Sequence, residues 1–311
     1  MEQKKPGERY NEIVAKLEKK YEVMGQDLSS YLDGLLYSDY LTYWDYIHLD
    51  TLLSLQNPKT SFPDEKVFIV YHQISELYFK LIIWEIEQIT AEEKPNADFF
   101  QDRLKRIIRY FEQLVSSFAI MVDGLDKDQF LKFRMALLPS SGFQSAQYRY
   151  IELMSTDLIN LVSAEDRATK NEGGAVGLME KLYWRKGATE LASGVKTLTL
   201  KHFEEKYMRS FSDLAVRFQS RNLNKIYTQN FKDHPQITEL LRAFDRLANV
   251  VWPLSHLKSA GKYLRKDPDD IRATGGTNWQ KYLPPRLQRI FFFPELWSDA
   301  EKAEWGTSDR G

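Results

Sequence analysis

The sequence of 311 residues contains no cysteine. Disulfide bonds, thiolate catalysis, iron–sulfur clusters and cysteine-ligated zinc are therefore all excluded. A metal ion in this protein would have to be bound by histidine, aspartate, glutamate or a ring system that the protein holds.

The sequence also has almost no net charge. Lysine and arginine together number 43 against 44 for aspartate and glutamate, which gives a formal charge of −1 at pH 7. Because no positive field is present to attract a polyanion, we expect no nucleic acid partner. A small-molecule ligand or a protein partner fits this balance better.

Long uncharged apolar runs are missing as well, and the opening segment MEQKKPGERYNEIVAKLEKK is charged throughout. A membrane-spanning helix needs about 20 apolar residues, and a signal peptide needs an apolar core. We therefore expect a cytoplasmic protein with no membrane partner.

Strict alternation of apolar and polar residues is scarce, whereas apolar residues recur at spacings of three and four. This pattern predicts an all-α fold. We expect an N-terminal helical arm over 1–38, one large helical domain over 39–297 and a charged tail over 298–311. The longer predicted helices cover about 8–26, 39–56, 64–91, 97–121, 127–137, a segment to about 163 that Ser140 or Ser141 caps, 196–220 and 235–265.

The centre of the third predicted helix, FIVYHQISELYFKLIIWEI, is apolar on every side, which predicts a helix buried within the molecule. His72 lies in its middle, and Phe68, Glu76 and Phe79 lie on the same face at helical spacing. A buried imidazole costs free energy unless it is paired, so this face holds either a structural hydrogen-bond network or a site. No second histidine stands at zinc-ligand spacing.

A second histidine in an apolar setting, His256, lies in NVVWPLSHLKSAG. A single histidine on such a helix is how a protein offers one axial ligand to haem iron, and a core histidine bonded to a carbonyl group is an equal alternative. Pro253 removes a backbone donor three residues earlier and should kink this helix.

Two further features suit a ligand with a carboxylate group. Arg134 lies among apolar residues in FLKFRMALLPSSG, where its guanidinium group could bind a carboxylate at two points or form an internal salt bridge. The RATGGT segment at 272–277 offers a threonine hydroxyl and backbone N–H groups, or is a plain surface loop. It lacks the lysine of a phosphate-binding loop, which disfavours nucleotide binding.

Several sequence strings together resemble the tryptophan 2,3-dioxygenase family over roughly residues 39–297. The strings are YWDYIHLDTLLSLQ at 43–56, DEKVFIVYHQISELYFK at 64–80, FRMALLPSSGFQSAQYRYIE at 133–152, ATGGT followed by YL at 273–283, and FFPELW near the C-terminus. The combination of HQxSEL with SSGFQS is highly specific for that family.

This resemblance implies an all-helical homotetramer that binds haem b. Such an enzyme adds both atoms of O2 across the indole C2–C3 bond of L-tryptophan and forms N-formyl-L-kynurenine, the first step of the kynurenine pathway. L-tryptophan and O2 are then the expected small-molecule partners.

The resemblance also assigns residues around the haem. His72 matches the catalytic histidine on the distal side, close to the indole N–H group, and Phe68 matches a residue that lines the indole pocket. His256 falls where the family has the proximal ligand of the haem iron. Ser141 matches a serine near the haem.

A second set of matched positions binds the amino-acid part of the substrate. Arg134 corresponds to the residue that binds the substrate carboxylate, and Thr274 to a residue that binds the carboxylate and ammonium groups. Phe130 lies beside this set, where some relatives have a tyrosine whose hydroxyl group could reach the carboxylate.

The last matched positions belong to the segment after the N-terminal arm. Tyr43, Tyr46 and Ile47 correspond to residues that a neighbouring subunit inserts into the pocket. The resemblance therefore implies an arm that packs on a neighbouring subunit and completes its site.

Three departures from the family pattern concern the proximal side and the loop that closes the site. Pro253 stands where relatives usually carry arginine, the stretch over 257–272 is longer than usual, and Ala273 replaces the usual first glycine. Two alternatives therefore stay open: a related haem enzyme that oxygenates another indole or aromatic amino acid, and a non-catalytic sensor of haem or tryptophan.

Overall fold

The computed structural model describes residues 6–37, 41–134, 142–167, 174–189, 195–264 and 284–307. These residues form helices joined by short connections, which confirms the predicted all-α fold. Extended pairing within them is limited to two isolated bridges. The chain divides into an N-terminal unit, residues 1–55, and a C-terminal unit, residues 56–311.

The N-terminal unit contains α1 (Pro6–Val23), α2 (Leu28–Tyr37), α3 (Tyr43–Tyr46) and α4 (Leu49–Leu53). The sequence pattern did not predict α2, although Asp27 caps it by accepting hydrogen bonds from the Ser29 and Ser30 N–H groups at 3.2 and 3.1 Å. Among the described residues of this unit, only Leu28 is buried. The unit by itself therefore has almost no core.

The predicted continuous helix over 39–56 is wrong. His48 separates α3 from α4 because it adopts a left-handed conformation, with φ 52°. A left-handed residue cannot continue a right-handed helix. Apolar spacing alone carries no signal for such a residue, so the pattern suggested one helix where there are two short ones.

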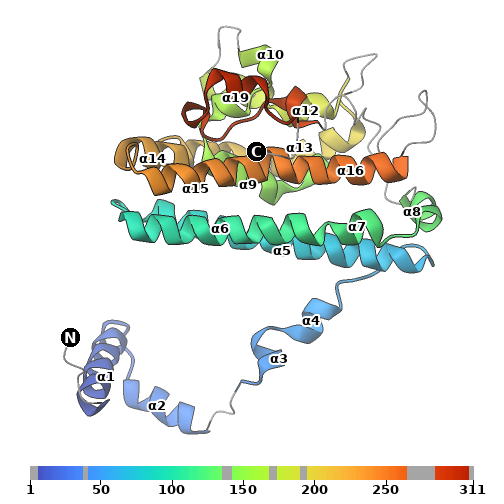
Figure 1. Ribbon diagram of the computed structural model, residues 1–311. Coiled ribbons are helices and arrows are strands. Elements are labelled where there is room, and N and C mark those ends of the chain that lie inside the picture. Colours follow the sequence, from blue (N-terminus) through green and yellow to red (C-terminus); the bar gives the residue numbers. More distant parts are fainter. Residues whose placement is uncertain are drawn as a thin grey trace. The chain divides into compact units, whose positions relative to one another are not determined.

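The C-terminal unit is built on α5 (Pro63–Ala91) and α6 (Ala97–Ser117), which pack against each other (Figure 1). Figure 1 shows a second layer over this pair, formed by α9 (Ala146–Ser155), α13 (Leu198–Phe218), α15 (Pro235–Arg246) and α16 (Trp252–Leu264). Helix α15 packs on α6, while α9 packs on both α5 and α13.

Helix α6 shows why the two layers hold together. One face places five fully buried side chains at alternating spacings of four and three residues, and the charged residues lie on the other face, as predicted for a surface helix. Each such side chain contributes roughly 1.5–3 kcal/mol through removal from water. The buried residues are Phe100, Leu104, Ile107, Phe111 and Leu114.

The prediction that the helix over 64–91 is buried on every side is wrong for the single chain. Its sequence is apolar all round, yet within the single chain only one face is buried, and the other carries exposed apolar side chains. Their spacing alternates between three and four residues, which is the spacing of a coiled-coil seam. These residues are Val67, Val70, Ile74, Leu77, Leu81 and Trp84.

The remaining described helices are short. Ser145 caps α9 by accepting a hydrogen bond from the Tyr148 N–H group at 3.2 Å, so the cap predicted at Ser140 or Ser141 is wrong. The other elements are α7 (Ala119–Asp123), α8 (Lys127–Phe133), η2 (Gly142–Gln144), η3 (Leu158–Leu161), α10 (Ala164–Arg167), α11 (Gly174–Glu180), α12 (Tyr183–Gly187), α14 (Leu223–Asn230), α18 (Pro285–Gln288), η5 (Pro294–Leu296) and α19 (Asp299–Ala303).

The helix predicted over 235–265 is interrupted. Between α15 and α16 the chain forms a π-helical turn, η4 (Leu247–Val251), whose defining bond runs from the Trp252 N–H group to the Leu247 carbonyl five residues earlier. Pro253 follows directly, and its ring would collide with the carbonyl group of residue 249 in an ordinary helix. The wider π turn accommodates the proline, so the expected kink takes this form.

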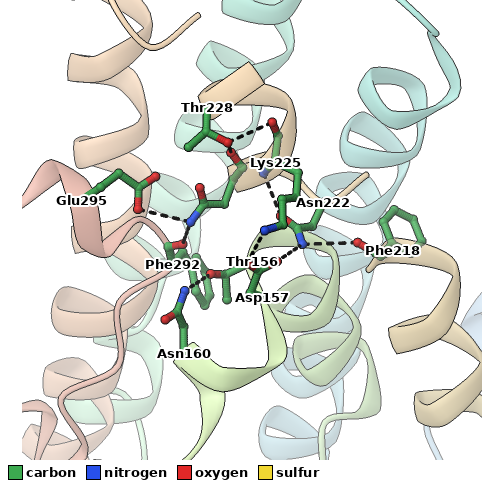
Figure 2. A network of polar contacts seen from close by, with 10 residues as sticks. Thr156, Asp157, Asn160, Phe218, Asn222, Lys225, Thr228, Phe292 and Glu295 are labelled. Carbon is green, nitrogen blue, oxygen red and sulfur yellow. Dashed lines mark hydrogen bonds and ion pairs between the residues drawn. The ribbon is translucent and has the colours of Figure 1, made fainter. Parts of the chain in front are cut away.

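Polar contacts fix the C-terminal segment against α14 (Figure 2). The Asn224 side-chain amide donates to the Phe292 carbonyl at 3.1 Å and to Glu295 at 3.3 Å. Asn222, the N-cap of α14, donates to Asp157 at 2.9 Å, as Figure 2 also shows. These contacts tie three chain segments that are distant in sequence.

Asp245 holds the same segment from α15. Its buried carboxylate accepts hydrogen bonds from the N–H groups of Phe292 and Phe293 at 2.9 and 3.2 Å and from the Trp297 indole N–H at 2.8 Å. Burial raises the pKa of Asp245 to about 6, although the four donors around it, including Asn249, act in the opposite direction. The FFPELW string thus has a structural role.

None of the helices in the described part of the chain is long and apolar enough to cross a membrane.

Candidate functional site

His72 projects from α5 in a defined orientation. Its Nδ1 atom lies 2.7 Å from the Phe68 carbonyl oxygen, and the centres of the two rings lie 4.0 Å apart. In the single chain His72 is exposed, so the prediction of a buried imidazole at this position is wrong for the chain on its own. Burial by the surrounding protein nevertheless lowers the pKa of His72, and the bond to Phe68 and the charge of Glu76 only partly oppose this effect.

His256 has the same type of surroundings on α16. Its Nδ1 atom lies 3.0 Å from the Trp252 carbonyl oxygen, and its ring centre lies 4.4 Å from that of Trp252 and 4.5 Å from that of Phe118. Burial lowers the pKa of His256 to about 4, and His72 contributes to the decrease. The His256 imidazole is therefore neutral at pH 7.

An aromatic path connects the two histidines. Tyr71 lies 6.1 Å from the His72 ring and 5.8 Å from Phe118, which in turn contacts His256. The two imidazoles are also close enough to interact electrostatically. The structure thus brings together the two histidines that the sequence singled out.

The sequence reasoning missed Tyr71, Phe118 and Trp252. Trp252 had a signal, because it precedes His256 by four residues as Phe68 precedes His72. Phe118 had none, since it lies between α6 and α7 and reaches the site only through the packing of helices.

A second aromatic group adjoins His72. Phe68 lies 6.3 Å from Phe130 and 5.8 Å from Phe133, and Phe130 also packs against Tyr263 of α16 at 5.1 Å. Helix α8 carries Phe130 and Phe133 and packs against both α5 and α16 (Figure 1). Arg134, half-buried, is the C-cap residue of α8 and directly follows Phe133. The structure therefore places Phe68, Phe130 and the backbone of Arg134 in or next to the aromatic group that adjoins His72.

The roles of the other predicted site residues remain predictions. Tyr43 and Tyr46 belong to the N-terminal unit, where they are 70% and 75% exposed, and Ile47 in the same unit is half-buried. Ser141 and Thr274 lie outside the described residues, as do residues 265–272 of the long 257–272 stretch.

The imidazole of His256 is suited to bind the iron of a haem group. A carbonyl oxygen only accepts hydrogen bonds, so the Nδ1 atom of His256 must carry the proton and Nε2 must carry the free lone pair. A neutral imidazole held in this way is a ready axial ligand for haem iron. Among the described residues no three His, Asp or Glu side chains cluster as a metal site.

Comparison with known proteins identifies the class. The sequence model of the family described as tryptophan 2,3-dioxygenase matches residues 34–172. A tryptophan 2,3-dioxygenase of Bradyrhizobium sp. is 30% identical over 273 residues, which cover 83% of this chain and 91% of that protein. One of Ruegeria pomeroyi is 28% identical over 274 residues, with coverage of 84% and 92%.

These matches extend over nearly the whole length of both relatives, and the matched region includes the helices that carry the two histidines. The chain is therefore an enzyme of the dioxygenase class with an all-helical fold. More specifically, it belongs to the tryptophan 2,3-dioxygenase family.

Proposed function

We propose that this enzyme oxidises L-tryptophan with O2 to N-formyl-L-kynurenine, using haem b bound through His256. The observation that carries the proposal is the pairing of two neutral-favouring imidazoles, His72 and His256, across one aromatic cluster. One imidazole serves as the iron ligand and the other faces the substrate.

The residues fit a haem group. The Nε2 atom of His256 is free to bind iron, and the aromatic rings of Phe118 and Trp252 hold the imidazole in place. When bound, the haem supplies the activation of O2. The protein orients the indole ring and limits the access of water.

His72 and its neighbours are proposed to bind the substrate. With Nδ1 engaged by the Phe68 carbonyl, Nε2 of His72 is left as an acceptor for the indole N–H group. Phe68 and Phe130 offer an apolar surface for the flat ring. Arg134 and Thr274 are proposed to bind the carboxylate and ammonium groups, while Ser141 contacts the haem.

We also propose a homotetramer in which Tyr43, Tyr46 and Ile47 complete the site of a neighbouring subunit. Two features of the single chain support it. The N-terminal unit has almost no core of its own, and α5 exposes an apolar seam at coiled-coil spacing. The same proposal includes the division of the chain into an arm over 1–38, a catalytic domain over 39–297 and a tail. It also includes a cytoplasmic location and a place in the kynurenine pathway.

The proposal is tested with a panel of substrates. Haem-loaded protein is reduced without oxygen, given O2 together with L-tryptophan, tryptamine or L-phenylalanine, and the products are separated by mass. The proposal requires N-formyl-L-kynurenine from L-tryptophan. No product from L-tryptophan, with product from another aromatic compound, would support the alternative of a related haem enzyme.

A further inference from the structure

The π turn before His256 leaves one backbone carbonyl group in need of a donor. In this turn the Trp252 N–H group donates to the Leu247 carbonyl, five residues earlier. With the same spacing of five residues, the N–H group of residue 253 would donate to the Ala248 carbonyl. Residue 253 is proline, which has no N–H group.

The hydroxyl group of Tyr148 supplies that donor. It lies 2.7 Å from the Ala248 carbonyl oxygen, although the two residues are 100 positions apart in sequence. Ala248 is fully buried and Tyr148 is 6% exposed. Burial raises the pKa of Tyr148 well above its usual range, so the hydroxyl group keeps its proton.

This contact lies at the base of the segment that carries His256. The ring of Trp252 packs against the His256 imidazole, and the Trp252 carbonyl oxygen accepts the Nδ1–H group of His256. Any shift of the turn moves both contacts, because Trp252 is the first residue after the turn. Tyr263 ties the far end of α16, where its hydroxyl donates to the Val122 carbonyl at 2.9 Å.

We infer that Tyr148 is a positioning residue for His256: its hydroxyl group takes the place of the helical donor that Pro253 lacks and so fixes the turn from which the imidazole projects. The role of His256 as iron ligand rests on the proposed function, whereas the coupling of Tyr148 to Pro253 does not.

The coupling is tested by a double-mutant cycle in the full chain without haem. Tyr148→Phe removes the hydroxyl group and leaves a buried carbonyl without a donor, so the unfolding equilibrium constant should rise about tenfold or more. Pro253→Ala returns an N–H group to residue 253. In that background Tyr148→Phe should change the constant by less than about threefold, and effects of Pro253→Ala on the unfolded chain cancel in the cycle.

Tyr227→Phe is the matched control. Tyr227 is also buried, and its hydroxyl donates to a backbone carbonyl, that of Lys232, at 3.0 Å. Its substitution should lower stability by the same factor whether residue 253 is proline or alanine. Equal effects of Tyr148→Phe in the two backgrounds would overturn the inference.

The positioning role needs a readout at His256 itself. The chain has five histidines, so the NMR signals of their ring protons can be resolved. Because the His256 ring lies between Phe118 and Trp252, ring currents should shift its signal strongly. Tyr148→Phe should move this signal, Tyr148→Phe with Pro253→Ala should bring it back towards its original position, and the His202 signal should stay unchanged.

Energetic coupling without any movement of the His256 signal would make Tyr148 merely structural and would overturn the positioning role. In haem-loaded protein the frequency of the iron–histidine stretching band should shift in Tyr148→Phe and return towards the wild-type value when Pro253→Ala is added. If wild-type protein shows no such band, the proposed function fails, while the haem-free measurements still decide the inference.

Discussion

His72 and His256 share one local arrangement although they lie on different helices. Each imidazole follows an aromatic residue by four positions and donates its Nδ1–H group to the carbonyl of that residue, at 2.7 Å for His72 and 3.0 Å for His256. Each ring also packs against that aromatic side chain, with centres 4.0 and 4.4 Å apart. Both Nε2 atoms are thereby left available in fixed directions.

The first prediction concerns the iron ligand. His256→Ala should abolish or strongly shift the Soret band of the purified protein, because it removes the imidazole between Phe118 and Trp252 that is proposed to bind the iron. Absorption spectra of equal amounts of protein and haem measure this. His202→Ala, at an exposed position on α13, is the control and should leave the spectrum as it is. An unchanged Soret band in His256→Ala would contradict the ligand assignment.

The second prediction concerns the carboxylate group of the substrate. Arg134→Leu should lower kcat/KM for L-tryptophan about 10- to 100-fold, mainly through KM, because a charge-assisted contact to a carboxylate is lost. Tryptamine lacks that carboxylate, so its kcat/KM should hardly change. Arg209→Leu, exposed on α13, provides the comparison. Equal losses for both compounds would show that Arg134 does not bind the carboxylate.

The third prediction concerns the pH dependence of stability. The pKa of Asp245 is raised from 3.8 to about 6 in the folded chain, so between these values the folded state binds one more proton than the unfolded state. The free energy of unfolding should therefore fall as pH rises from about 4 to about 6, by on the order of 3 kcal/mol from this group.

Asp245→Asn should remove this part of the slope and lower stability throughout, since an amide cannot accept all the hydrogen bonds that Asp245 accepts. Urea denaturation at several pH values measures it. Asp233→Asn, at an exposed position, is the control. If the free energy of unfolding of Asp245→Asn fell with pH as steeply as that of the wild type, the raised pKa would not belong to Asp245.

The fourth prediction concerns the apolar seam of α5. Ile74→Glu combined with Leu81→Glu should reduce the molar mass measured by light scattering, because two charges cannot be buried between apolar surfaces. Lys80→Glu lies on the same helix outside the seam and should keep the mass. A full-sized assembly in the double variant would exclude the seam as an interface.

Much of the helical framework was predictable, because helices such as α5 and α6 follow from apolar spacing and from local signals at their ends, such as Pro63 in the first turn of α5. The interruptions of the predicted helices were not predictable from the sequence. The left-handed His48 and the π turn before Pro253 leave the apolar period intact, so spacing could not reveal them. The exposed face of α5 was hidden for another reason, since a sequence does not say which chain covers an apolar surface.

The site was predictable only in part. His72 and His256 stood out because imidazoles are rare among apolar residues, and family resemblance then gave each a role. Their proximity depends on the packing of α5, α7, α8 and α16, which no local pattern contains. For the same reason Phe118 and Tyr148 escaped notice, as both act across the interior on residues far away in sequence.

The most direct test of the account is an oxygen-isotope measurement. Haem-loaded wild-type protein is reduced, supplied with L-tryptophan and 18O2 in ordinary water, and the product is examined at once by mass spectrometry. The account predicts N-formyl-L-kynurenine in which both added oxygen atoms are 18O. A product with a single 18O atom, or no product from L-tryptophan in a protein that binds haem, would contradict it.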